Sequence, residues 1–136
     1  MLRGSSGGHG MTIGYITLGA NDVEQALPFY DAVLGAIGYE RGPLDGGWAF
    51  YGRGDAPGVG ICRPFDGQAA RGGNGVMIGF KADTQDQVTA AYDAALAQGG
   101  TDEGAPGFRP PEATSGFYGA YVRDAAGNKL CVYTTV

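Results

Sequence analysis

Apolar residues recur at helical spacing in two stretches of the chain, each three to four positions apart, as in a helix with one buried face. The first stretch comprises Val23, Ala26, Leu27, Tyr30, Val33, Leu34 and Ile37. The second is weaker and comprises Val88, Ala91, Tyr92, Ala95 and Leu96. Asp22-x-x-Gln25 and Thr84-x-x-Gln87 resemble capping boxes, so we expect helices to begin near residues 22 and 84.

Glycine and proline indicate how these helices end and bend. Gly38 and the pair Gly99-Gly100 follow the last periodic positions, where glycine commonly terminates a helix. Pro28 lies inside the first helix and is expected to kink it.

Short apolar segments bounded by turn residues predict strands before and after each helix. In the first half they cover residues 14–18, 39–41, 47–52 and 59–63. In the second half they cover 76–80, 101–103, 118–123 and 129–134, with a turn at 124–128 and a Pro-rich loop at 105–115. Each half therefore reads β-α-β-β-β.

The two halves are also related in sequence. Residues 16–42 align without a gap with residues 78–104, 62 positions later, and nine aligned pairs are identical. Two copies are too few for a solenoid, which needs at least three repeats. The repeat predicts one pseudo-twofold domain whose halves pack together, with a cleft as a product.

Composition narrows the class of protein. At 136 residues the chain is one domain's worth, and no apolar run approaches the ~18 residues of a membrane span. A net charge of -5 argues against nucleic-acid and membrane partners; it indicates either simple solubility or attraction for a cationic ligand.

The chain ends and the cysteines add two expectations. Residues 1–10 are Gly/Ser-rich and are expected to be an expression remnant or a disordered leader, which would leave the domain without its only histidine, His9. Cys62 and Cys131 are too few for a disulfide scaffold and too far apart for a CxxC motif. We therefore expect a reduced, cytoplasmic protein.

The segment ITLGANDVEQALPFY, the paired halves and the closing YVRDAAGNKL resemble the vicinal oxygen chelate superfamily, which includes glyoxalase I, extradiol dioxygenases and bleomycin-resistance proteins. The resemblance covers Met11 to Val136. It implies an α+β fold in which two βαβββ modules, in a pseudo-twofold arrangement, form cupped, mostly antiparallel sheets around a cleft. The modules would be residues 11–66 and 75–136, joined by a linker at 67–74. Family habit also implies a homodimer.

The resemblance places the four metal-ligand positions of metal-dependent members at Tyr15 and Met77 on the first strands, and at Cys62 and Cys131 on the last. The two cysteines correspond if Gly58-x-x-Ile61 is aligned with Gly127-x-x-Leu130. An Fe(II) dioxygenase requires two histidines and a carboxylate, and a hard divalent ion requires oxygen or imidazole ligands. We therefore predict no cofactor. The alternative is a soft Cu(I) or zinc site at the cysteines and Met77.

The cleft implied by the resemblance is lined by Tyr15, Thr17, Trp48, Phe50, Gly60, Cys62, Met77, Gly79, Lys129 and Cys131. Tyr15 is the candidate catalytic residue, as a general acid or hydrogen-bond donor; it is otherwise an aromatic of the cleft wall. Lys129 is a candidate anion ligand or base, and Arg109 a candidate carboxylate clamp, although each is also explained as a solvated surface cation. Glycines on this face would leave room for a ligand or serve sheet twist.

These observations predict a protein that binds a small organic ligand in its cleft without the usual family metal. The alternative is an active enzyme, lactoylglutathione lyase-like or dioxygenase-like, that uses non-standard ligands or a metal-free mechanism.

Overall fold

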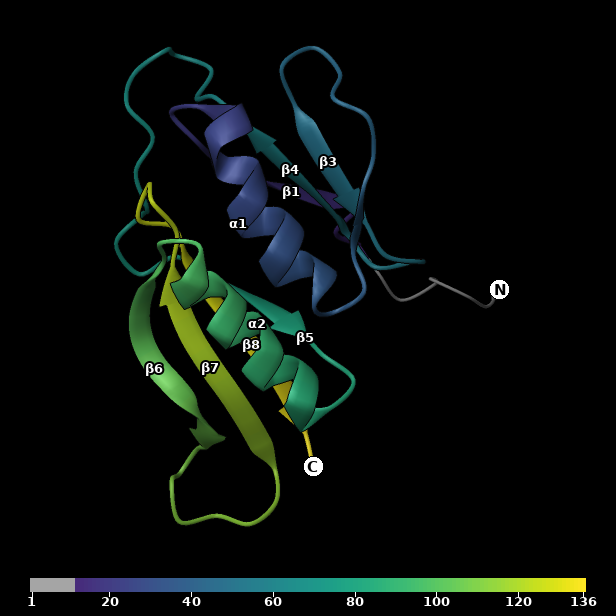
Figure 1. Cartoon of the computed structure of the whole chain (residues 1–136), viewed down its shortest axis with the longest axis vertical. Helices are drawn as coiled ribbons and strands as arrows, with labels where there is room; N and C mark the ends of the chain where they lie inside the picture. The colour runs from purple at the N-terminus through teal and green to yellow at the C-terminus, as the bar shows by residue number, and fades with distance from the viewer. Residues whose placement is uncertain (1–11) are drawn as a thin grey trace.

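The computed structural model describes residues 12–136, so the expected leader and His9 lie outside the described residues. The first module contains β1 (Tyr15–Gly19), α1 (Val23–Gly35), β2 (Glu40–Arg41), β3 (Ala49–Gly52) and β4 (Gly58–Cys62) (Figure 1). The second contains β5 (Met77–Lys81), α2 (Gln85–Ala97), β6 (Thr101–Phe108), β7 (Phe117–Arg123) and β8 (Lys129–Thr135). The predicted α+β fold of two βαβββ modules is confirmed.

Each module forms a four-stranded sheet with the same topology. The orders are β1-β4-β3-β2 and β5-β8-β7-β6, and the two sheets share no strand pairing. In each sheet the first strand runs parallel to the last, and the other two pairings are antiparallel. One backbone hydrogen bond repeats after both first strands, from Ala20 to Cys62 (2.9 Å) and from Ala82 to Tyr133 (2.7 Å). The shared topology of the two modules fits the sequence repeat.

Both helices begin where their capping signals predicted. Asp22 Oδ1 accepts a hydrogen bond from the Gln25 amide at 3.2 Å, and Thr84 Oγ1 accepts one from the Gln87 amide at 3.1 Å. These side chains satisfy donors that the first helical turn leaves without partners. α1 is assigned as one helix across Pro28. Among the described residues, neither helix has the length and apolar character required to cross a bilayer.

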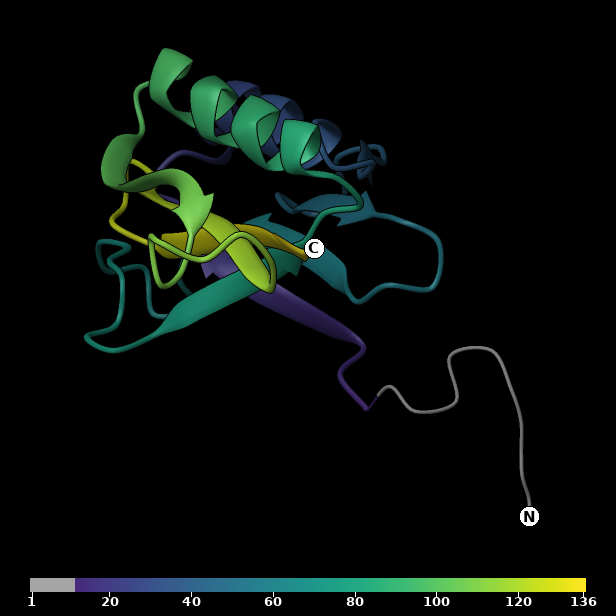
Figure 2. The same cartoon turned by 90° about the horizontal axis from the view of Figure 1, so that it is seen from below.

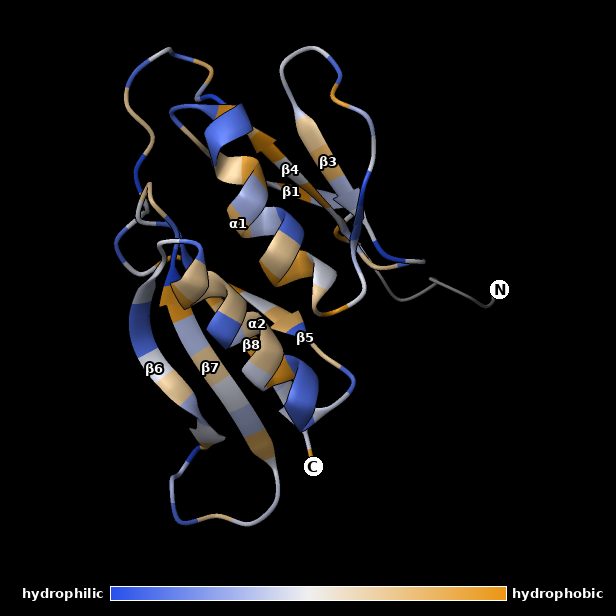
Figure 3. Ribbon diagram, viewed as in Figure 1, coloured by the Kyte–Doolittle hydropathy of each residue, from blue (hydrophilic) through white to orange (hydrophobic). Residues whose placement is uncertain are grey.

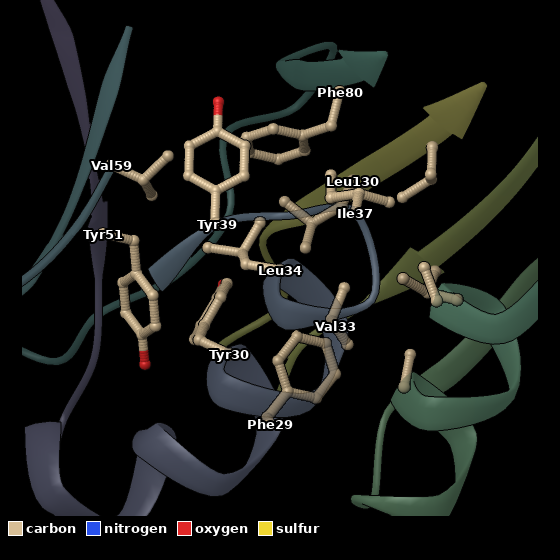
Figure 4. Packing of buried hydrophobic residues seen from close by; sticks show 14 of the residues in the cluster. Phe29, Tyr30, Val33, Leu34, Ile37, Tyr39, Tyr51, Val59, Phe80 and Leu130 are labelled. Carbon is tan, nitrogen blue, oxygen red and sulfur yellow. The ribbon is translucent and has the colours of Figure 1, made fainter. Parts of the chain in front are cut away.

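The helices pack together on one side of both sheets and bury the core beneath them (Figure 2). Strand residues facing the helices are fully or almost fully buried, as Val59, Ile61 and Leu130 show. Figure 4 shows Tyr30 and Leu34 of α1 pointing into this cluster beside Tyr51 and Val59. Figure 3 shows the same division between apolar and polar segments: β4 is largely apolar, whereas the start of α2 is hydrophilic.

A buried polar cluster joins the two modules. The Tyr30 hydroxyl of α1 donates to Asp124, a carboxylate only 8% exposed in the turn between β7 and β8. Asn128 Nδ2 donates to the same carboxylate at 2.8 Å and to the Gly19 carbonyl at 3.0 Å. Asp124 and Asn128 thus stabilise their own turn and connect it to the first module.

One predicted segment is wrong in part. The sequence predicts a loop over 105–115, but β6 extends to Phe108. Its pairing with β7 shifts register between Asp102 and Gly104 and again between Gly104 and Gly107. β6 is an edge strand, where Pro106, which lacks an N–H, is tolerated. The loop therefore begins only at Arg109.

Candidate functional site

The candidate site is the face of each sheet that points away from the helices. Side chains alternate between the two faces of a strand, so residues two apart share a face. In the first sheet this open face carries Tyr15, Trp48 and Phe50. The Trp48 and Phe50 rings are stacked with centroids 5.6 Å apart, and Tyr15 meets Phe50 edge-on at 5.9 Å. Tyr15 and Phe50 are 61% and 40% exposed, so the cluster is open to a ligand.

Glycine makes room for this aromatic cluster. A Cβ atom on Gly60 would lie 3.0 Å from Cε3 and Cζ3 of Trp48, closer than side chains normally approach. A Cβ on Gly58 would contact Phe50 and Tyr15, each at 3.6 Å. The absence of a side chain at Gly58 and at Gly60 therefore lets the rings lie over β4.

The open face of the second sheet has an aromatic cluster that the sequence analysis missed. Phe117 and Tyr133 stack with centroids 5.1 Å apart, and Tyr121 pairs directly with Cys131 across β7 and β8. Strand alternation counted outward from Cys131 would have found Tyr133, and its pairing with β7 would have found Tyr121. Gly79, which is also a predicted cleft residue, pairs with Cys131 from β5, on the other side of β8 from Tyr121.

Lys129 and Arg109 both lie against Tyr121. The Lys129 Nζ atom is 5.7 Å from the centroid of the Tyr121 ring, and Arg109 Cζ is 5.5 Å from it. Arg109 immediately follows β6, whereas Lys129 begins β8. The structure thus brings to one ring two cations that lie 20 positions apart in the sequence.

The expected correspondence between the two cysteines is wrong by two residues. Cys62 pairs with Gly19 in the first sheet. In the 62-residue repeat Gly19 corresponds to Lys81, and Lys81 pairs with Tyr133 in the second sheet. Cys62 is therefore the counterpart of Tyr133. The alignment failed because it matched Gly58, already inside β4, with Gly127, which still lies in the preceding turn.

The four positions that the resemblance assigns do not fit a hard divalent ion, and neither does Gly60, which the strand register makes the counterpart of Cys131. Within residues 12–136, no three His, Cys, Asp or Glu side chains gather as a metal-binding group. Burial raises the pKa of Cys62 and of Cys131, which favours the neutral thiol over the thiolate that metals bind. Both cysteines are free. Tyr15 and Met77 add a phenol and a thioether, neither of which suits such an ion.

The predicted cleft residues form two groups rather than one. Each group lies on its own sheet, and no strand pairing joins the two sheets in the described part of the chain. The first group is Tyr15, Thr17, Trp48, Phe50, Gly60 and Cys62; the second is Met77, Gly79, Lys129 and Cys131. The ring of Tyr15 meets the ring of Phe50. That contact supplies no base to activate the phenol.

Two hollows lie elsewhere in the described part of the chain. One of about 410 Å³ opens between the modules, where Ile16 of β1 approaches Met77, Gly79 and Tyr133. Another of about 230 Å³ lies at the start of α1 beside Tyr30 and Asp124. The first reaches two predicted cleft residues. The second contains none, and its Tyr30–Asp124 contact belongs to the cluster that joins the modules.

Comparison with known proteins gives a consistent family. The model of the Glyoxalase/Bleomycin resistance protein/Dioxygenase superfamily matches residues 12–132. No curated protein matches the chain.

Solved structures agree with this match. A glyoxalase/bleomycin resistance protein from Albidiferax ferrireducens is 38% identical, with 93% of this chain and 100% of that chain covered and a TM-score of 0.83. A glyoxalase-related enzyme from Fulvimarina pelagi is 20% identical, with 91% and 88% covered and a TM-score of 0.70. A family enzyme from Burkholderia phytofirmans is 18% identical, with 90% and 98% covered and a TM-score of 0.69. The last two show the fold alone.

Proposed function

Because this chain belongs to the glyoxalase/bleomycin resistance protein/dioxygenase superfamily, we propose that it binds a small organic molecule on the open faces of its sheets, without the metal ion of metal-dependent members. The observation that carries the proposal is the aromatic cluster over glycine on β4. Ligand pockets are lined mainly by apolar and aromatic side chains, and Trp48 and Phe50 provide such a surface.

The donor chemistry supports the metal-free part of the proposal. The cysteines have raised pKa values. No acidic or imidazole side chain stands at the four assigned positions, or at Gly60, the counterpart of Cys131 in the strand register. An enzyme of the family that uses these positions would need a metal held by thiols, a phenol and a thioether. Binding requires no such site.

We also propose that two copies of the chain assemble and partly cover the open faces. Exposed apolar side chains occur in pairs at the starts of β1 and of β5: Ile13 and Tyr15, and Val76 and Met77, are 43–61% exposed. Burial of apolar surface is the main driving force of most protein–protein association. A cytoplasmic location is proposed with it, since free cysteines suit a reducing compartment.

Elemental analysis of protein purified without a histidine tag tests the metal-free proposal. We expect less than stoichiometric metal, with no change on Cys62→Ala or Cys131→Ala. Stoichiometric metal that is lost on either substitution would contradict it. A thermal-shift screen with small aromatic compounds then tests binding, and stabilisation by none of them would contradict the ligand-binding function.

A further inference from the structure

The two cations against Tyr121 form a feature that aromatic binding alone does not explain. Arg109 and Lys129 both lie within the ~6 Å at which a cation is attracted to an aromatic ring. Arg109 reaches this ring from the start of the loop after β6, and Lys129 reaches it from β8, so their positive charge converges over the open face of the second sheet.

Neither cation is neutralised by a carboxylate. The ion pairs within residues 12–136 join Arg41 to Asp31, Arg53 to Asp83 and Arg123 to Glu103. No Asp or Glu of that region is within 4.0 Å of the side-chain nitrogens of Arg109 or Lys129. Arg63, Arg71 and Lys81 of that region also take part in no ion pair, so what distinguishes Arg109 and Lys129 is that both lie against the same ring.

Arg109 is held in place by backbone groups. Its Nη1 donates to the Phe108 carbonyl at 3.1 Å, and its Nη2 donates to the Ala105 carbonyl at 2.9 Å. Glycines leave space for it, since a Cβ on Gly104 or Gly107 would come within 3.3 or 3.1 Å of the guanidinium. A guanidinium has five N–H donors, so these two bonds leave others for a ligand.

The positive potential reaches the floor of the face. Cys131 is 2% exposed, and burial raises the pKa of its thiol. Arg109 and Lys129 both oppose that effect on the Cys131 pKa by favouring the negatively charged form. A negative group placed above Tyr121 would feel the same attraction.

We propose that the open face of the second sheet selects ligands with an anionic group, a carboxylate or a phosphate, bound by Arg109 and Lys129 with an aromatic or planar body against Tyr121. This inference rests on the proposed function and names its ligand class. It departs from the cationic ligand that the net charge of the whole chain suggested, because the local charge of this face has the opposite sign.

A titration of the full chain, followed by ¹H–¹⁵N NMR at the Gly79 and Gly119 amides, tests the proposal. The probes are phenylacetate, phenyl phosphate, uncharged phenylacetamide and cationic phenethylamine. We expect at least one anion to bind about tenfold more tightly than the amide, the gain of a charged hydrogen bond. The two anions distinguish carboxylate from phosphate.

Arg109→Gln and Lys129→Gln should each weaken binding of the preferred anion by about three- to tenfold. Arg71→Gln, which removes the same charge from an exposed linker position, should leave it unchanged. Unchanged anion affinity in both face variants would show that these cations only pack on Tyr121, and would overturn the proposal.

The probes also separate this proposal from the broader one. Equal or tighter binding of the amide or amine at the same amides would overturn anion selection but leave ligand binding on the open face intact. Failure of all four probes to perturb the residues of either open face would contradict both.

Discussion

A single glycine determines where the aromatic surface of the first sheet can lie. Gly60 is buried on β4 directly beneath Trp48, and a Cβ there would meet two ring carbons at 3.0 Å. Its pairing partner on β3 is Phe50, so both stacked rings depend on this one position. The alternation of side chains along the strand places Gly60 on the cleft face. Its contact with Trp48 can be inferred only once the pairing register of β3 with β4 is known.

Gly60→Ala should displace Trp48 and destabilise the fold by roughly 1–3 kcal/mol, as overpacking does. Because Trp48 is the only tryptophan, the shift of its fluorescence emission reports the displacement. Gly52→Ala is the matched control, since a Cβ there meets nothing within 4 Å. Identical emission spectra for the two variants would contradict the contact.

The environment of Tyr30 predicts that the folded protein loses stability at high pH. Burial, then the charge of Asp124, raises the pKa of Tyr30 far above its ordinary value. Above about pH 10 the unfolded tyrosine loses its proton while the folded one keeps it, so stability falls as pH rises, by up to about 1.4 kcal/mol per pH unit.

Tyr30→Phe should be less stable at neutral pH by roughly 1.5–3 kcal/mol, the value of a hydrogen bond to a charged group, but should lose less stability between pH 9.5 and 11. Urea unfolding at both limits measures this. Tyr118→Phe, at a half-buried tyrosine of β7, serves as control. Parallel pH profiles in wild type and Tyr30→Phe would contradict the assignment.

The helices were more predictable than the strands. Helical spacing and the caps at Asp22 and Thr84 act locally, so the sequence located both helix starts. The predicted strand at 101–103 is shorter than β6 because Gly104, Pro106 and Gly107 are residues typical of loops. Only its edge position and the register shifts against β7, which are properties of the whole sheet, make those residues compatible with a strand.

Arg53, just after β3, joins the modules at the end of β5. Its Nη1 donates to the Lys81 carbonyl at 2.7 Å, and its Nη2 to Asp83 Oδ1 at 3.1 Å. Because the Asp83 side chain is 70% exposed, the ion pair should contribute only a few tenths of a kcal/mol. Arg53→Gln should cost about 1 kcal/mol and Asp83→Asn clearly less, measured by urea unfolding. Equal losses would show that the ion pair dominates.

At the scale of the molecule, the internal repeat predicted the fold because two copies of one motif must bury two equivalent apolar faces. It could not predict the site in full. The residues around Tyr121 come from β6, β7 and β8 and meet only through long-range strand pairing. The shift of the cysteine correspondence has the same cause, since it depends on where each strand begins relative to its partner.

Assembly should depend on the exposed starts of β1 and β5. Sedimentation velocity should give wild-type protein about twice the mass of the 13.9 kDa chain. The double substitution Tyr15→Ser, Met77→Ser should shift it toward monomer, because both side chains are exposed and apolar. Leu96→Ser, at an exposed position of α2, should not. A monomeric wild type, or a dimer lost only on Leu96→Ser, would contradict the proposed interface.

The most direct test of metal-free ligand binding is a crystal structure of chelator-treated protein soaked with a mixture of small aromatic acids and amides. The account predicts density for a bound fragment against Trp48 and Phe50, or against Tyr121 and Phe117, with no metal ion beside it. Fragments found only in the hollow beside Tyr30 and Asp124, or binding restored only by added metal, would contradict the account.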